Sequence, residues 1–90
     1  MDTNSKIEHT LRKHINVFKI DIIDESYKHQ NHKKDTSGGH FRLLIVSDDF
    51  KSKNLVQRHR MVYDAMGELM KHEIHALSMK TLTSHEWDNA

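Results

Sequence analysis

The chain has 90 residues, which is enough for one small domain with one modest hydrophobic core, so we interpret residues 1–90 as a single domain. Fourteen Lys and Arg against thirteen Asp and Glu leave a formal charge of +1, which excludes a strong overall attraction to nucleic acid or membranes. The absence of cysteine excludes disulfides, a thiol nucleophile and a metal cluster held by this chain's own thiolates.

The sequence also bears on where the protein works. No apolar run approaches the roughly 20 residues of a membrane span, and no secretory signal opens the chain. We therefore expect no membrane association and a cytoplasmic location, with a mitochondrial or other organellar location as the alternative.

The first predicted elements are a helix and a strand. Residues 3–14 predict a helix capped by Thr3 or Asn4, with a thin apolar stripe. From residue 17 the apolar residues alternate with polar ones, which predicts a strand buried on one face. The side chains expected on that buried face are Phe18, Ile20 and Ile22.

A polar loop and a second strand follow. Residues 27–39 contain no apolar side chain after the tyrosine and end in a glycine pair, Gly38-Gly39, which we interpret as a hinge. Residues 41–47 carry apolar side chains on both faces, a pattern typical of a central strand.

The second half of the chain predicts a long helix, a strand and a short helix. Residues 54–72 place their apolar residues in one stripe, which we expect to include Leu55 and His59. Residues 75–83 predict a strand, and capping-box spacing from Thr83 predicts a final helix. The expected face of the strand is His75, Leu77 and Met79.

This order of elements, αββαβα, predicts the fold class. The first two strands should pair antiparallel, whereas strand, long helix and strand form a βαβ unit whose strands are parallel. We therefore expect an α+β two-layer sandwich in which helices cover one face of a three-stranded mixed sheet.

The topology brings two of the nine histidines together. His40 lies just before the second strand and His75 opens the third, so parallel pairing places both at the same end of the sheet. Neighbouring strands are about 4.8 Å apart, which brings the rings within reach of one metal ion. Two imidazoles are half of a four-ligand site, so a partner would have to supply the other ligands.

The positions of the other histidines in the sequence do not indicate a ligand role. We interpret His59 as a structural residue with a buried hydrogen-bond partner. The remaining histidines are expected to be solvated or at helix ends, namely His9, His14, His29, His32, His72 and His85.

The sequence also bears on two further functional classes, enzymes and DNA-binding proteins. The sequence has no nucleophile elbow, phosphate-binding loop or dinucleotide fingerprint, so we expect no enzymatic activity. Arg58, Arg60 and Lys53 form a basic patch around the start of the long helix, which keeps binding to DNA open as the alternative. A Gly-x-x-Gly loop, with which KH modules clamp nucleic acid, is absent.

Taken together, these segments resemble the BolA family over about residues 5–88. The residues that carry the resemblance are Asp24-Glu25-Ser26-Tyr27, His40-Phe41 before RLLIVS, LVQRHRMVYDAM at 55–66, IHALSMKTLT at 74–83 and Glu86-Trp87. The resemblance implies a class II KH-like fold without the Gly-x-x-Gly loop. It also implies a role in iron–sulfur cluster maturation or trafficking, or in iron-status regulation, and some bacterial members resemble transcriptional regulators.

The resemblance further implies a partner and a cofactor. Members of the family bind monothiol glutaredoxins with a Cys-Gly-Phe-Ser motif and share a [2Fe–2S] cluster with the glutaredoxin cysteine and glutathione. The family's invariant histidine matches His75, and its second ligand position, cysteine or histidine, matches His40. Arg58, Arg60 and Lys53 would contact the partner or the carboxylates of glutathione.

Histidine at the second position has two expected consequences. A ligand set with two histidines raises the reduction potential of the cluster relative to all-thiolate ligation. Because histidine must be neutral to bind a metal, formation of the complex should weaken as the pH falls below about 6.5.

Overall fold

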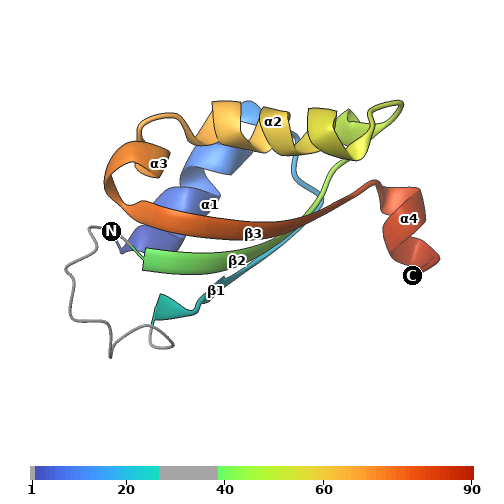
Figure 1. Cartoon of the computed structure of the whole chain (residues 1–90). Helices are drawn as coiled ribbons and strands as arrows, with labels where there is room; N and C mark the ends of the chain where they lie inside the picture. The colour runs from blue at the N-terminus through green and yellow to red at the C-terminus, as the bar shows by residue number, and fades with distance from the viewer. Residues whose placement is uncertain (1, 27–38) are drawn as a thin grey trace.

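The computed structural model describes residues 2–26 and 39–90, which form a three-stranded sheet with helices packed on one face (Figure 1). The elements in chain order are α1 (Thr3–His14), β1 (Lys19–Asp24), β2 (Gly39–Val46), the 3-10 helix η2 (Asp48–Phe50), α2 (Leu55–Met66), α3 (Leu69–His72), β3 (Ile74–Leu82) and α4 (Ser84–Asp88). The predicted α+β class is confirmed. The loop predicted at 27–39 lies, up to residue 38, outside the described residues.

The sheet has the predicted topology. Its order is β1-β2-β3, with β1 antiparallel and β3 parallel to the central strand β2. The central position of β2 explains why apolar residues occupy both of its faces in the sequence. Its inward side chains, Phe41, Leu43 and Ile45, are at most 4% exposed and form the middle of the core.

Helix α1 covers the sheet together with α2. Its predicted stripe is confirmed, because Ile7 and Leu11 are fully buried. Its cap differs from the prediction: Asp2, and neither Thr3 nor Asn4, accepts a hydrogen bond of 2.8 Å from the Ser5 amide. A side-chain acceptor at this position satisfies an amide that the helix itself leaves unpaired.

The single long helix predicted at 54–72 is wrong, because the chain breaks into α2 and α3. Helix α2 ends at Met66, and Gly67 follows with a φ of 55°, in the region that glycine enters without steric strain. A new helix then begins at Leu69. The apolar periodicity continues across the break and therefore hid it, whereas the glycine was the signal of a helix end.

Two residues expected in the core lie outside it. Leu55 is 61% exposed because it stands in the first turn of α2, and the inward face of that helix carries Val62 and Met66 instead. Phe18 is 65% exposed because it precedes β1, whereas Ile20 and Ile22 pack against the core as predicted.

Helix α4 departs from the predicted single helical layer. It begins at Thr83 with the predicted capping box, in which Thr83 and Glu86 each bind the other's backbone amide. It projects from the end of β3 rather than covering the sheet alongside α1 and α2 (Figure 1). Across the described parts of the chain, no helix has both the length and the apolar character needed to cross a bilayer.

Candidate functional site

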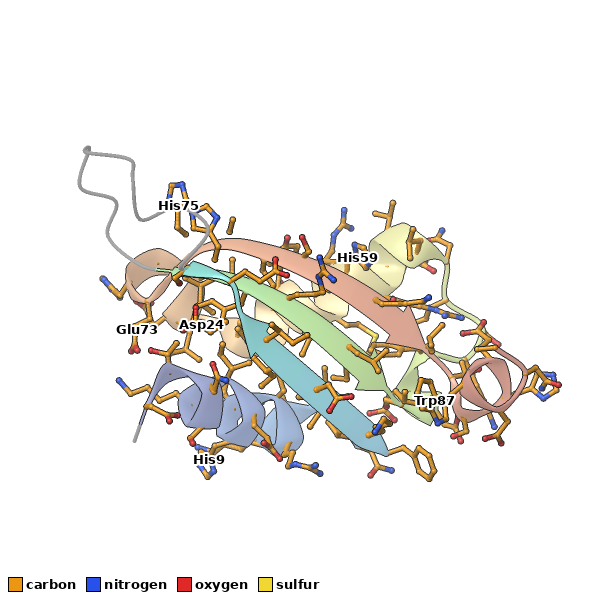
Figure 2. The ribbon with its side chains drawn as sticks, turned by 90° about the horizontal axis from the view of Figure 1, so that it is seen from below. His9, Asp24, His59, Glu73, His75 and Trp87 are labelled. Atoms are coloured by element: carbon orange, nitrogen blue, oxygen red, sulfur yellow. The ribbon has the colours of Figure 1, made fainter. Side chains whose placement is uncertain are left out.

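His40 and His75 lie together at one end of the sheet. The centroids of their rings are 5.0 Å apart and the ring planes are inclined by 51°. They come from the starts of the parallel strands β2 and β3, and Figure 2 shows His75 at that end of the sheet. The juxtaposition predicted from the topology is confirmed, and the role of the two rings as metal ligands stays a prediction.

An irregularity in β3 turns His75 toward His40. Gly39 pairs with Ile74, but the next residue, His40, pairs with Ala76, so His75 is an extra residue in its strand. Ile74 is 3% exposed and points into the core. An extra residue of this kind re-aims a side chain. The expectation that His75, Leu77 and Met79 share one face is therefore wrong, because Leu77 and Met79 pack against the core whereas His75 is exposed beside His40.

The backbone around His40 is held by three hydrogen bonds. The His40 amide donates to Ser26 Oγ at 3.1 Å, and the His40 carbonyl accepts from the Glu25 amide at 2.7 Å. The preceding amide, of Gly39, donates to the Glu73 carbonyl at 3.1 Å. His40 therefore occupies its place beside β3 as part of a paired strand.

Gly39 allows a close approach, and its predicted role in a hinge stays a prediction. It is the first residue of β2, and a Cβ atom there would collide with Ser26 Oγ and approach the Phe41 ring to 2.9 Å. The absence of a side chain is what lets β2, Ser26 and the Phe41 ring meet. Gly38, the other half of the predicted hinge, lies outside the described residues.

Glu73, two positions before His75, is tied to α1. Its carboxylate accepts hydrogen bonds from Lys6 Nζ at 3.0 and 3.1 Å, and Thr3 Oγ1 lies 3.5 Å from it. The pair is partly exposed, so its contribution to stability is small. Its geometric effect is to fix the turn between α3 and β3, where Glu73 lies in Figure 2.

The separation of the two histidine rings is compatible with binding to one metal ion. Two imidazoles that bind one tetrahedral ion through bonds of about 2.1 Å have their ring centroids roughly 5 Å apart. The observed separation of 5.0 Å matches that value. No group of three or more histidine, cysteine or acidic side chains within the described residues is arranged to hold a metal ion. Among the described residues, the pair therefore has no third ligand of this kind.

The structure gives Arg58 several contacts within the chain, and its predicted contact with a partner stays a prediction. Its guanidinium donates to both carboxylate oxygens of Glu86 at 2.7 and 3.1 Å and to the Thr81 carbonyl at 3.1 Å. Its Nε donates to the Lys53 carbonyl at 2.9 Å, and its side chain is only 13% exposed. Thr81 follows His75 by six positions in β3, which is about 20 Å at the rise of a strand. Arg58 is therefore structural and remote from the histidine pair.

The contact with Arg58 stabilises the ionised form of the Glu86 carboxylate. The hydrogen bonds from Arg58, and then the Thr83 amide, lower the pKa of Glu86 from its usual 4.5 to about 2. The carboxylate therefore stays ionised well into the acid range.

Arg60 and Lys53 line a shallow hollow on α2 together with Asp64. Arg60 is exposed and Lys53 is partly exposed. They share the region of Arg58 rather than that of the histidines, so the structure does not bring the predicted basic residues and the predicted ligands into one site. Partner binding by Arg60 and Lys53 stays a prediction.

Arg42 is the cation that sequence reasoning missed. It follows His40 by two residues in β2 and therefore lies on the same face of the sheet, about 7 Å along the strand. Its guanidinium lies 3.2 Å from the Glu25 carboxylate and is largely exposed. The alternation of side chains along the strand was the signal that could have found it.

The other histidines fall into two groups. The Nε2 atom of His59 is buried and has no hydrogen-bond partner among the described residues, so the predicted partner is wrong. The expected exposure of the histidines in the helices is confirmed for His9, His14, His72 and His85. His29 and His32 lie outside the described residues.

Comparison with known proteins assigns the chain and its fold to a family. The model of the family described as BolA-like protein matches residues 11–86. The chain belongs to the BolA family. It is 34% identical over 88 residues to the DNA-binding transcriptional regulator BolA of Escherichia coli (strain K12), a match that covers 98% of this chain and 82% of that protein.

Two further BolA relatives come from Arabidopsis thaliana. SufE-like protein 1, chloroplastic/mitochondrial, is 37% identical over 87 residues, covering 90% of this chain and 24% of that longer protein. The solved structure of BolA1 has a TM-score of 0.80 at 35% identity and covers 96% of both chains. The observed sheet and helices are thus those of BolA structures.

Proposed function

We propose that this BolA-like protein is a non-enzymatic adaptor that binds a monothiol glutaredoxin and completes a bridging [2Fe–2S] cluster with His75 and His40. One observation carries the proposal: two exposed or partly exposed imidazoles lie at the separation that a single metal ion requires. The chain has no thiolate to add, so the other iron would be held by the glutaredoxin cysteine and glutathione.

The residues of this chain divide the work of such a site. His75, aimed by the extra residue in β3, is the primary ligand, and His40 is the second. Ser26 and Glu73 hold the two strand starts in place through their contacts with the backbone of Gly39 and His40. When bound, the cluster is the cargo that the complex carries in maturation, trafficking or iron-status signalling.

The proposal is tested by adding the protein anaerobically to cluster-loaded monothiol glutaredoxin and glutathione. We expect the visible circular dichroism to change as the histidines replace ligands on one iron. His75→Ala should abolish the change, and His40→Ala should leave a weaker, more labile complex. The proposal fails if both variants give the wild-type spectrum.

His72→Ala is the matched control. His72 is exposed and lies three residues before His75, but its imidazole faces Glu68 at 3.3 Å on α3. Its replacement should leave the spectrum unchanged. Far-UV circular dichroism and thermal unfolding of each variant separate loss of a ligand from loss of the fold.

Binding to DNA is the second candidate function, favoured by the name of the E. coli relative, DNA-binding transcriptional regulator BolA. In this chain Arg60 is the exposed cation of α2 and Lys53, just before the helix, is partly exposed, whereas Arg58 is bound to Glu86. This function predicts a mobility shift of duplex DNA that weakens steeply with salt and with Arg60→Gln. The absence of a shift at low salt would remove it.

The names of the plant relatives bear on the location. SufE-like protein 1 is named chloroplastic/mitochondrial, which supports an organellar location as the alternative to the cytoplasm. Imaging of the tagged protein in its own cell distinguishes the two.

A further inference from the structure

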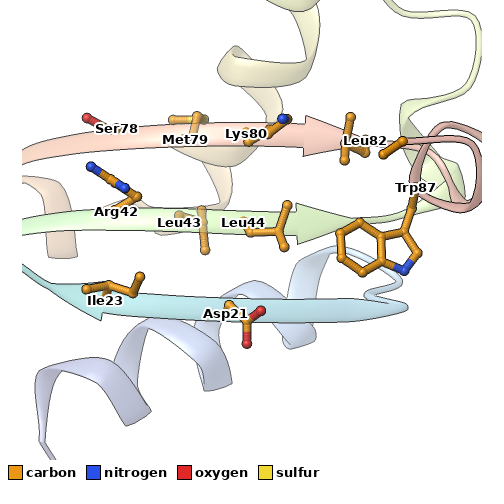
Figure 3. Close-up of a pocket in the computed structure, with 11 residues that line it drawn as sticks. Asp21, Ile23, Arg42, Leu43, Leu44, Ser78, Met79, Lys80, Leu82 and Trp87 are labelled. Carbon is orange, nitrogen blue, oxygen red and sulfur yellow. The ribbon is translucent and has the colours of Figure 1, made fainter.

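The face of the sheet that α1 and α2 leave open contains a hollow of about 420 Å³ (Figure 3). Its lining comes from all three strands and from α4. The side chains that shape it are Ile23, Arg42, Leu44, Lys80, Leu82 and Trp87. Neither His40 nor His75 lines it, so it is separate from the proposed ligand pair.

The register of the sheet explains the floor of this hollow. Leu44 pairs with Asp21 on one side and Lys80 on the other, so an apolar side chain stands between an anion and a cation. Asp21 and Lys80 are two strands apart, about 10 Å. The space over Leu44 between these two charged residues is therefore wide enough for a flat ring system.

Trp87 forms the end wall. Figure 3 shows its indole at the α4 end of the hollow, beyond Leu44 and across from Arg42. Lys19 Nζ lies 5.5 Å from the centroid of the indole ring. Helix α4 is fixed by the Arg58–Glu86 contact, which holds the wall in position.

The charges around the hollow favour an anion. The acidic side chain that lines it already has a cation, since Asp21 lies 3.7 Å from Lys19, and the lining Arg42 lies 3.2 Å from Glu25. Lys80 is exposed and forms no ion pair with any described residue. An incoming carboxylate would find this ammonium without displacing another partner, whereas a cation would find Asp21 already beside Lys19.

We propose that this hollow binds a small aromatic carboxylate, with the ring on Leu44 against Trp87 and the carboxylate at Lys80. The volume is in the range of small-molecule sites, which combine an apolar lining with a few polar groups that orient the ligand. Aromatic faces prefer offset or edge-on contacts with an indole, which the end wall provides.

The test uses the single tryptophan of the chain as the reporter. 2-Naphthoate is titrated into the full chain while Trp87 fluorescence is followed, beside naphthalene-2-methanol and 2-naphthylmethylammonium. We expect saturable quenching for all three ligands, with the highest affinity for the carboxylate. The affinity of the alcohol should be about five-fold lower, and that of the ammonium should be no higher than that of the alcohol. Equal affinities for all three, or no saturation with 2-naphthoate, would overturn the proposal.

Two lysine variants locate the carboxylate. Lys80→Gln should lower the affinity for 2-naphthoate about five-fold and leave the affinity for the alcohol unchanged. Lys71→Gln makes the same change of charge at an exposed position on α3 and should bind like the wild type. Equal behaviour of the two variants contradicts the site. His75→Ala should bind 2-naphthoate normally, so this outcome is independent of the proposed cluster ligation.

Discussion

The two ends of the sheet use their polar side chains in opposite ways. At the end where β2 and β3 begin, the backbone holds His40 and His75 side by side, and the His75 side chain faces solvent. At the other end, the Arg58 guanidinium is hydrogen-bonded to Glu86 and to a carbonyl of β3. The comparison teaches that a charge in the sequence predicts binding only where the fold leaves it available.

The largest difference between the two ends is expected from Arg58→Gln. The variant removes the charged donor from the Thr81 carbonyl and from the partly exposed Glu86 carboxylate, which should lower the free energy of unfolding by about 1–2 kcal/mol. His75→Ala, at an exposed position, should change it by less than about 0.5 kcal/mol. Denaturant unfolding measures both. Equal losses in the two variants would erase the distinction between a structural end and a functional end.

Gly39→Ala should disturb the histidine end itself. The added Cβ meets Ser26 Oγ and the Phe41 ring, so we expect a loss of about 1–3 kcal/mol and a displaced His40. In a Ser26→Ala background the loss should shrink, because one of the colliding atoms is gone. Denaturant unfolding gives the energies, and NMR of the histidine rings reports the displacement. A fully additive double mutant would show that the Ser26 contact is unimportant.

Acid should loosen the α4 end first. The pKa of Glu86 is about 2 in the folded chain against 4.5 when unperturbed. Its contribution to stability is therefore complete above pH 4.5 and is lost as the pH falls toward 2. Glu86→Gln should reduce this loss, as measured by denaturant unfolding and Trp87 fluorescence between pH 5 and pH 2.5. The assignment fails if the variant has the same acid profile as the wild type.

The smallest effect is expected from Lys6→Gln. Its contact with Glu73 is partly exposed, so the stability should fall by roughly 0.5 kcal/mol. The His75 ring signals in NMR should nevertheless shift, since Glu73 fixes the turn that leads into β3. Lys71→Gln, on the solvent side of α3, should shift them less. A larger shift in Lys71→Gln than in Lys6→Gln would show that the contact with α1 does not determine the position of His75.

The pattern of the sequence predicted the meeting of His40 and His75 because it depends only on strand order. Alternation identified β2 and β3, and the helix between them made the strands parallel. The extra residue at His75 could not be predicted, because it depends on how Gly39 and Ile74 meet across two strands. Strand pairing of this kind has no local signature.

The fate of Arg58 was equally hidden from the sequence. Its partner Glu86 is 28 residues away and lies on a helix that follows β3. The sequence shows a cluster of three basic residues, but only the contact between Arg58 on α2 and Glu86 on α4 decides which of them stays exposed. Arg42 shows the opposite case, since the alternation along β2 already placed it beside His40.

The central claim is that both imidazoles bind the iron of a shared cluster. The most direct measurement is pulsed electron paramagnetic resonance of the reduced complex, formed with this protein labelled with ¹⁵N-histidine and an unlabelled glutaredoxin. The account predicts strong couplings from two ¹⁵N nuclei, reduced to one in His40→Ala and absent in His75→Ala. A reduced cluster in the isolated complex with no ¹⁵N coupling would contradict it.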